Sequence, residues 1–492
     1  MLFNSTVFLF YFLPFSFSIY FLLSHSKYFK GASLFLLLAS LVFYSYWNIY
    51  YLPLILGSIG VNFLLSQKIM KASNIKMKKS LLTIGILLNI GLLFIFKYSD
   101  FFIENINLIL DNKMSLFNLA LPLAISFFTF QQIAYLVDSF HDKVQENNFI
   151  NYSLFVTFFP QLIAGPIVHH KEMMPQFQKP ENRYINYRNI SIGLFIFSIG
   201  LFKKVVLADT FCVWVDLGFG SSSTLDFFEA WATIISFYFQ LYFDFSGYTD
   251  MAIGLGLLFN IKLPINFNSP YKSTSIIELW SKWHMTLSTF VNIYVFKPLL
   301  HLFGSYSFLK AMFALFTSML IIGIWHGASW MFVLFGLVHA IAIVINHTWK
   351  KKVQISLPNY VGWSLTFLTI IVSMVFFRST GISESTELLT AMFTIDTIHI
   401  LKLVAELLNS VLNFSFFTFT ASSYKYIFSL DTFVWIVFGF GFYIVLYLKN
   451  SNQIIEDFKF KKYQAFFIVF SLVCFYFLSI EVDETPFLYF VF

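Results

Sequence analysis

His326 is an ionisable residue inside a stretch that otherwise has the composition of a membrane helix. It lies in GIWHGASW, and positions 311–349 contain no Asp, Glu, Lys or Arg. Gly323 and Gly327 flank it, and glycine lets a backbone unwind or approach a neighbour closely. A buried imidazole must find water, a partner or a substrate, and its ordinary pKa suits general base catalysis near neutral pH. We therefore predict that His326 is catalytic, with Trp325 as a supporting residue; a satisfied core histidine is the alternative.

The other histidines carry weaker signals. His284 lies in WSKWHMTLS beside a lysine and two tryptophans, a setting that is common at the membrane interface. His169 and His170 follow a stretch broken by prolines and are predicted to be solvated loop residues. His339 and His347 have no flanking signature, so we predict structural or interfacial roles for them.

Two carboxylates, Asp244 and Asp250, lie in YFDFSGYTDMAIG between strongly apolar flanks. An ionisable group inside a membrane segment costs roughly 2.5–3.5 kcal/mol, so it usually faces the bundle interior and has a role. Acid–base chemistry or substrate contact is one interpretation. The simpler one is structural: the carboxylates cap a helix or pair with Lys203 or Lys204.

The elements that must position these residues are membrane helices. Of the 492 residues, 58% are hydrophobic and 11% are charged, whereas soluble domains carry about 25% charged residues. Apolar runs recur at the length of a spanning helix, which predicts an all-α polytopic membrane protein with about eleven transmembrane helices plus re-entrant and interfacial segments. We predict one domain over 1–492, with N-terminal spans (1–113), a catalytic motif region (114–350) and C-terminal spans (351–492).

The charge distribution predicts sidedness rather than a nucleic-acid partner. The net charge is +6, but the positive residues stand in short loops between apolar runs, where they set topology. The lysine-rich loops 68–79 and 350–352 are predicted to be cytoplasmic. The two cysteines are far apart in sequence, which argues against a disulfide framework and a structural zinc site. Residues 1–24 lack a basic n-region, so we predict a retained first helix.

Two segments break the simple spanning pattern. Pro160, Gly165 and Pro166 interrupt an apolar run, and non-helical backbone at membrane depth must be buried in protein or line a wet cavity. A re-entrant loop is therefore predicted there. In 275–290, apolar residues recur at helical spacing with polar residues between them, which predicts an amphipathic helix that lies at the interface or dips into the protein.

Several motifs, in order from about residue 120 to the C-terminus, resemble the membrane-bound O-acyltransferase family, and most closely its bacterial alginate O-acetyltransferase branch. The N-terminal spans agree in pattern only. The motifs are PLAISFFTFQQIAYLVDSF, FFPQLIAGPIV, QLYFDFSGYTDMAIGLG, LPINFNSPY, ELWSKWHMTLSTF, GIWHGASW and PFLYFVF.

The resemblance implies a fold and a reaction. It implies a ring of tilted helices around a funnel in a bacterial inner membrane, with a cytoplasmic acyl thioester meeting a hydroxyl from the other side. The histidine of WHG, His326, would be catalytic, and the histidine of W-x-x-W-H, His284, would support it. No metal or bound cofactor is implied. The donor would be acetyl-CoA or an acyl-carrier protein, and the acceptor a cell-envelope glycan such as an alginate-like exopolysaccharide or peptidoglycan, reached through a periplasmic partner protein.

The chain also departs from that branch. Asn292 and Ile293 stand where Arg and Asp are usual, a glycine-rich stretch is missing, and Ser281 and Lys282 replace a double arginine. These changes leave the donor and the acceptor open. D-alanyl transfer from a carrier protein to teichoic acid is one alternative, and a transporter, flippase or glycan polymerase is another. Transport does not require the ordered W-x-x-W-H and W-H-G pair.

Basic residues near these motifs are candidate contacts for the phosphates of a nucleotide-bearing donor. They include Lys272, Lys282 and Arg183, because positive groups at the mouth of a site attract phosphates. The alternative is that these residues only obey the charge rule for cytoplasmic loops.

Overall fold

The structure is a computed structural model that describes residues 1–26, 28–110, 113–144, 147–163, 165–394, 432–481 and 487–488. All regular structure within these ranges is helical. The helices of the first half are α1 (Leu13–His25), α2 (Phe29–Ser45), α3 (Leu52–Lys71), α4 (Ile75–Leu93), α5 (Ser99–Leu110), α6 (Ile125–Phe140), α7 (Phe149–Thr157), α8 (Phe159–Leu162), α9 (His170–Gln178), α10 (Tyr187–Phe202), α11 (Asp209–Phe219) and α12 (Phe227–Leu258).

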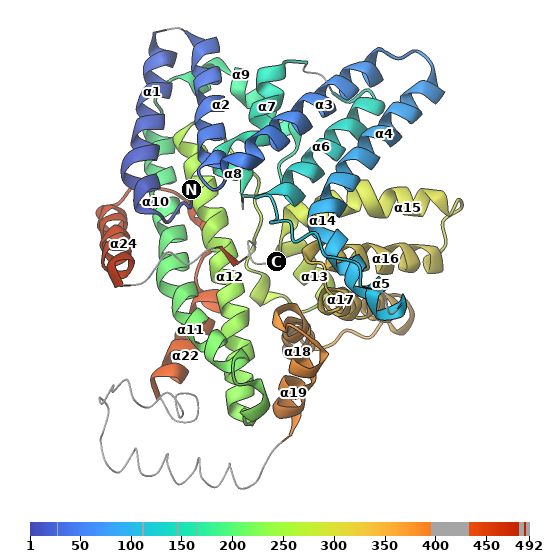
Figure 1. Ribbon diagram of the computed structural model, residues 1–492. Coiled ribbons are helices and arrows are strands. Elements are labelled where there is room, and N and C mark those ends of the chain that lie inside the picture. The colour runs from blue at the N-terminus through green and yellow to red at the C-terminus, as the bar shows by residue number, and fades with distance from the viewer. Residues whose placement is uncertain are drawn as a thin grey trace.

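The second half continues in the same manner (Figure 1). Its helices are α13 (Ile276–Lys282), α14 (Met285–Val291), α15 (Lys297–Leu302), α16 (Phe308–His326), α17 (Trp330–Thr348), α18 (Asn359–Arg378), α19 (Ile382–Phe393), α22 (Thr432–Tyr447), α23 (Ser451–Glu456) and α24 (Lys462–Glu481). Short π-helical or 3₁₀ turns join several of them, including η3 (Phe94–Tyr98), η4 (Pro180–Arg183), η5 (Lys203–Ala208), η8 (Asn292–Phe296) and η9 (Trp349–Val353).

The predicted class, a polytopic helical membrane protein, is confirmed. By length and composition, seven described helices could cross a membrane: Phe8–His25, Ile49–Lys71, Ile75–Leu110, Tyr187–Phe219, Phe308–His326, Trp330–Val353 and Asn359–Arg378. Shorter apolar helices occupy Phe29–Ser45, Ile436–Tyr447 and Lys462–Leu478. The apolar run 407–424, which the expected number of about eleven spans includes, lies outside the described residues.

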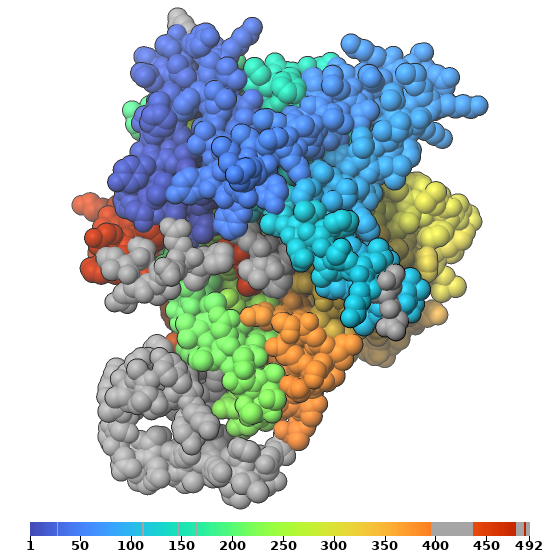
Figure 2. Space-filling model, viewed as in Figure 1, coloured from blue at the N-terminus to red at the C-terminus, as the bar shows by residue number. Residues whose placement is uncertain are grey.

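Helix α12 is the central element of the fold. It begins with a capping box, in which the Asp226 carboxylate accepts from the Glu229 N–H at 2.8 Å and the Glu229 carboxylate accepts from the Asp226 N–H at 3.0 Å. Its 32 residues correspond to about 48 Å, and almost every side chain after the first turn is buried. The N-terminal part of the chain, drawn in blue to cyan, fills the upper part of the visible face, and the green and orange segments with the start of α12 and helices α18 and α19 lie below it (Figure 2).

Glycines allow α10 to lie directly against α12. A Cβ at Gly200 would lie 2.4 Å from the Gly247 carbonyl oxygen, and one at Gly193 would lie 2.7 Å from that of Gly254. No side chain fits at these distances, so the two backbones pack against each other, as small residues permit in membrane helices.

The two segments that interrupt the spanning pattern are buried in protein. The backbone of residues 165–169, directly before α9, is non-helical, and Ile167 and Val168 are buried there, as the prolines predict. The segment 275–290 is not one helix: it breaks between α13 and α14 at His284, whose φ is 44°. Trp280 and Leu287 are also buried, so this segment dips into the protein and does not lie on its surface.

Candidate active site

His326 is the last residue of α16 and is buried with 5% of its surface exposed. Gly323, one turn earlier, faces α17 so closely that a Cβ would lie 2.7 Å from the Gly336 Cα. This contact fixes the end of α16. The imidazole ring then lies among the rings of Phe335 and Phe377, with centroids 5.6 and 5.3 Å away.

His284 is 1% exposed and sits in a left-handed turn at the start of α14. The side-chain Oδ1 of Asn266 accepts from the Thr286 N–H at 3.3 Å and lies 3.1 Å from His284 Nδ1. Because that oxygen is an acceptor, Nδ1 carries the proton and Nε2 keeps its lone pair. Nε2 is buried and has no hydrogen-bond partner within the described ranges, so it is available to accept a proton or a hydrogen bond.

The Trp325 ring lies close to the rings of both predicted histidines. Its ring centroid is 5.0 Å from that of His326 and 6.3 Å from that of His284. The three residues come from α16 and from the α13–α14 break, which are about 40 positions apart in sequence. The structure therefore brings His284, Trp325 and His326 into one buried cluster.

A small cavity of about 40 Å³ borders this cluster. It is lined by Trp325, His326, Lys97 and residues of the segment that leads into α6. Lys97 donates to the carbonyl oxygens of Trp325 and His326 at 2.7 and 2.9 Å. No sequence pattern marked Lys97 as a candidate site residue. The available signal was a single charge directly after the uncharged run 80–96, but such a residue is normally an interfacial anchor.

The carboxylates Asp244 and Asp250 are engaged in ion pairs on α12. Lys204 lies 2.9 Å from Asp244 and 2.8 Å from Asp209, and Lys203 lies 2.6 Å from Asp250. The Leu488 N–H also donates to Asp244 at 2.9 Å. Both carboxylates thus tie η5 to α12, and the contacts favour the structural interpretation of these residues.

The predicted donor-binding residues are each bound to local partners. Lys272 donates to the Leu448 carbonyl oxygen at 3.2 Å, and Lys282 pairs with Glu278 at 2.7 Å. Arg183 lies on η4, with its guanidinium 4.1 Å from the centroid of the Phe29 ring.

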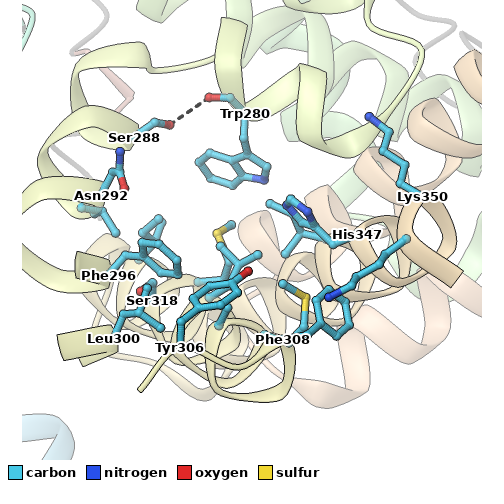
Figure 3. A pocket seen from close by; sticks show the side chains of 18 residues that line it. Trp280, Ser288, Asn292, Phe296, Leu300, Tyr306, Phe308, Ser318, His347 and Lys350 are labelled. Atoms are coloured by element: carbon cyan, nitrogen blue, oxygen red, sulfur yellow. Dashed lines mark hydrogen bonds between the residues drawn. The ribbon is translucent and has the colours of Figure 1, made fainter. Parts of the chain in front are cut away.

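A larger cavity of about 840 Å³ lies between the α13–α14 segment and helices α16 and α17 (Figure 3). Its wall is mostly apolar. Trp280, Tyr306 and Phe308 line it, and His347 and Lys350 border it on the side of α17 (Figure 3). The wall also includes Ile322, which precedes His326 by one turn of α16.

His339 and His347 are placed near this cavity. His339, predicted to be structural, is 2% exposed and accepts from the Trp280 indole N–H through Nδ1 at 3.3 Å. His347 lines the cavity itself.

The prediction that His169 and His170 are solvated loop residues was wrong. His170 is 4% exposed, and the Nε2 atoms of both histidines lie 2.9 Å from Asp138 Oδ2. The Tyr294 hydroxyl donates to the same oxygen at 3.1 Å. Proximity in sequence to a lysine loop suggested solvent, but the folded chain places α6 and η8 over the pair.

Asp138, His169 and His170 are residue types that can bind a metal ion, but in this structure they are joined to one another by hydrogen bonds. The Lys171 N–H donates to His169 Nδ1 at 3.3 Å, so in this arrangement Nε2 of that ring carries the proton and donates to Asp138. Burial raises the pKa of Asp138, but hydrogen bonds from His169 and His170 outweigh burial and hold the pKa below its usual range. We interpret the group as a hydrogen-bonded cluster that fastens the α8–α9 segment.

This cluster predicts a loss of stability in acid. Burial lowers the pKa of His170, and the charges of His169 and Lys171 lower it further, against the hydrogen bond and charge of Asp138. His170 therefore becomes protonated near pH 6.5 in the unfolded chain but stays neutral at that pH in the folded protein. Since the unfolded chain then binds more protons, the free energy of unfolding falls as the pH falls below that value. We expect the thermal midpoint in detergent to decline from about pH 6.5 downward and His170→Gln to flatten the decline.

Exposed His301 on α15 provides the matched control. His301→Gln should retain the wild-type dependence on pH. An unchanged slope in His170→Gln would show that His170 is not the titrating group.

Comparison with known proteins identifies the family to which the chain belongs. A sequence model of the family described as MBOAT, membrane-bound O-acyltransferase family, matches residues 138–385. The chain is 45% identical over 446 residues to the peptidoglycan O-acetyltransferase of Helicobacter pylori, covering 84% of each protein. It is 34% identical over 403 residues to the Pseudomonas aeruginosa protein named "Probable alginate O-acetylase AlgI", covering 81% of this chain and 76% of that one.

A more distant relative is the teichoic acid D-alanyltransferase of Streptococcus thermophilus, 28% identical over 239 residues, or 47% of this chain and 58% of the relative. The family match includes both His284 and His326. It decides between the enzyme and the transporter or polymerase interpretations in favour of the enzyme. The chain belongs to the membrane-bound O-acyltransferase family and is an O-acyltransferase of the membrane.

Proposed function

We propose that this protein transfers acetyl groups from a cytoplasmic thioester toward hydroxyls of peptidoglycan. The observation that carries the proposal is the 45% identity, over 84% of both chains, to a peptidoglycan O-acetyltransferase. The alginate-related protein is less similar, which makes an alginate-like exopolysaccharide the second choice of acceptor.

In the proposed reaction His326 is the general base. It takes the proton of the acceptor hydroxyl, and the oxygen attacks the thioester carbonyl carbon, whose π electrons move to the carbonyl oxygen. When this tetrahedral intermediate collapses, the carbon–sulfur bond breaks and the thiolate leaves with the proton from His326. General base catalysis contributes typically 10²- to 10⁴-fold, and positioning in a site that excludes water contributes much of the rest.

His284 has the role of a supporting acceptor. Its Nδ1 proton is held by Asn266, which leaves the Nε2 lone pair directed into the buried cluster. A neutral ring in this tautomer can accept a hydrogen bond from the incoming hydroxyl or from a bridging water, and so orient it toward His326. Ring orientation set by a bond to the far nitrogen is a common arrangement for functional histidines.

The donor side of the site is the 840 Å³ cavity, which has room for a pantetheine arm between its apolar walls. Lys350 and Lys351 border it, and this pair replaces Lys272 and Lys282 as our candidate for binding donor phosphates. Asn292, one of the positions that departs from the alginate branch, lines the same cavity. The change therefore falls where it can alter donor choice.

We expect Lys350→Gln together with Lys351→Gln to raise the apparent KM for acetyl-CoA about two- to fivefold at low salt, the effect of losing about 1 kcal/mol of ionic attraction. The increase should shrink as salt screens the charges. The matched control is Lys272→Gln with Lys282→Gln, which should change the KM little. An increase in KM seen only in the control pair would indicate that the donor phosphates bind near α13.

The acceptor side implies a partner. The cavity beside His326 is far smaller than the donor cavity, about 40 Å³ against about 840 Å³, so it suits a small hydroxyl-bearing side chain better than a whole glycan. We propose that a hydroxyl side chain of an extracytoplasmic partner enters, receives the acetyl group and passes it to the glycan.

The proposal is tested with the purified protein in nanodiscs and two labelled donors. Acetyl-CoA with the partner, or with a small alcohol as its substitute, should give acetyl ester and free CoA in equal amounts. Cells that lack the protein should yield peptidoglycan with reduced base-labile acetate. Transfer from a D-alanyl carrier protein in place of acetyl-CoA would instead support the resemblance to the D-alanyltransferases and would overturn the acetyl assignment.

A further inference from the structure

Lys97 reaches the active site from a part of the chain outside the family match at 138–385. It lies on η3, a π-helical turn between α4 and α5, and such turns often occur where a helix presents a functional residue. Its ammonium donates to the last two carbonyl oxygens of α16, those of Trp325 and His326, at 2.7 and 2.9 Å.

A structural role explains part of this arrangement. The end of a helix has unpaired carbonyl groups and a partial negative charge, which a cation stabilises. Tyr98, the next residue, also serves this end, because its hydroxyl donates to the Ile324 carbonyl oxygen at 3.0 Å. A neutral side chain is therefore able to donate to this helix end, and carbonyl capping alone does not require a lysine.

The cost of the charge points to a further role. Lys97 is partly buried in an apolar span, and no described carboxylate lies within 4.0 Å of its ammonium. An ammonium group in such a segment is expensive and usually marks function. It has three N–H donors, of which the two carbonyl groups account for two. The same side chain lines the 40 Å³ cavity together with Trp325 and His326.

We propose that Lys97 is the cationic group of the acyl-transfer centre. It holds the backbone that carries His326, and its positive charge stabilises the negative charge that develops on the thioester carbonyl oxygen when the hydroxyl oxygen attacks. The electron pair that the oxygen gains in that step returns when the carbon–sulfur bond breaks, so the lysine gives up no proton. Preorganised charge at a developing oxyanion is often the largest single contribution to catalysis. This inference rests on the acyl-transfer function proposed above.

Three substitutions separate charge from positioning. Lys97→Met removes both, Lys97→Gln keeps a neutral donor for the α16 carbonyl groups, and Lys97→Arg keeps the charge. We expect kcat for acetyl transfer to fall about 10²- to 10³-fold in the Met and Gln variants, the usual effect of losing one oxyanion donor, with KM nearly unchanged. The Arg variant should recover a substantial part of the activity.

Tyr98→Phe is the matched control, because it removes a neutral donor from the same helix end. It should lower kcat by less than about fivefold. Thermal midpoints are measured for every variant, and the comparison of Gln with Arg is informative even if the Met variant does not fold. Wild-type kcat in Lys97→Gln, or equal losses in Lys97→Gln and Tyr98→Phe, would show that Lys97 only caps α16.

The outcome is distinguishable from failure of the proposed function. If His326→Ala is inactive and Lys97→Gln is fully active, the acyl-transfer assignment stands and the inference about Lys97 is wrong. If His326→Ala retains turnover, the proposed centre itself is misplaced.

Discussion

His326→Ala is expected to eliminate acetyl transfer while the protein still folds and inserts into the membrane. The substitution removes the proposed general base, and loss of a general base alone costs roughly 10²- to 10⁴-fold. His326 ends α16, and the backbone there is held by Lys97 and by the contact between Gly323 and Gly336, which the substitution leaves in place. The measurement is turnover of acetyl-CoA by equal amounts of purified protein, together with acetate on isolated peptidoglycan.

His339→Ala is the matched control. It removes a histidine of similar burial from the neighbouring helix α17, whose ring contacts Trp280 and Phe335. We expect it to lower the thermal midpoint and to retain most of the turnover. Equal losses of turnover in both variants would indicate that His326 is needed for packing and not for proton transfer.

Lys204→Met is expected to have the largest effect on stability. Lys204 is 3% exposed and bridges Asp209 and Asp244 at 2.8 and 2.9 Å. Removal of this cation takes an ion-pair partner from both carboxylates, and Asp244, only 2% exposed, is poorly solvated by water. Breaking a buried ion pair from one side costs about 3–5 kcal/mol. Denaturant titration in detergent should show this loss.

Two further variants identify the cause. Lys204→Met combined with Asp244→Asn should recover part of the stability, because the stranded charge is then also removed. Lys449→Met breaks an exposed pair with Asp457 and should leave the transition unchanged. A double variant as unstable as Lys204→Met alone would indicate that packing of the lysine stem, and not charge, stabilises η5 against α12.

Much of the class and part of the site could be predicted from the sequence, because both depend on local composition. The free energy of transferring a helix into lipid is approximately a sum over its residues, so apolar runs of spanning length identify a membrane protein without tertiary information. His326 became a candidate because glycines and an uncharged run surround it, and its catalytic role stays a prediction. Pairing of Asp244 and Asp250 with Lys203 or Lys204 was one of the alternatives that the sequence offered, and the structure shows both ion pairs.

The tertiary structure decided which distant segments meet, and composition carries no record of that. Lys97 is 228 positions from Trp325, and in the sequence it has the pattern of an interface anchor. Tyr294 lies 156 positions from Asp138, so their cluster with His170 was invisible to local patterns. The left-handed turn at His284 was equally hidden, because helical spacing continues through a break that only packing imposes. Hydrophobic periodicity tells which face of a helix is buried, but the neighbour that buries it is chosen by the fold.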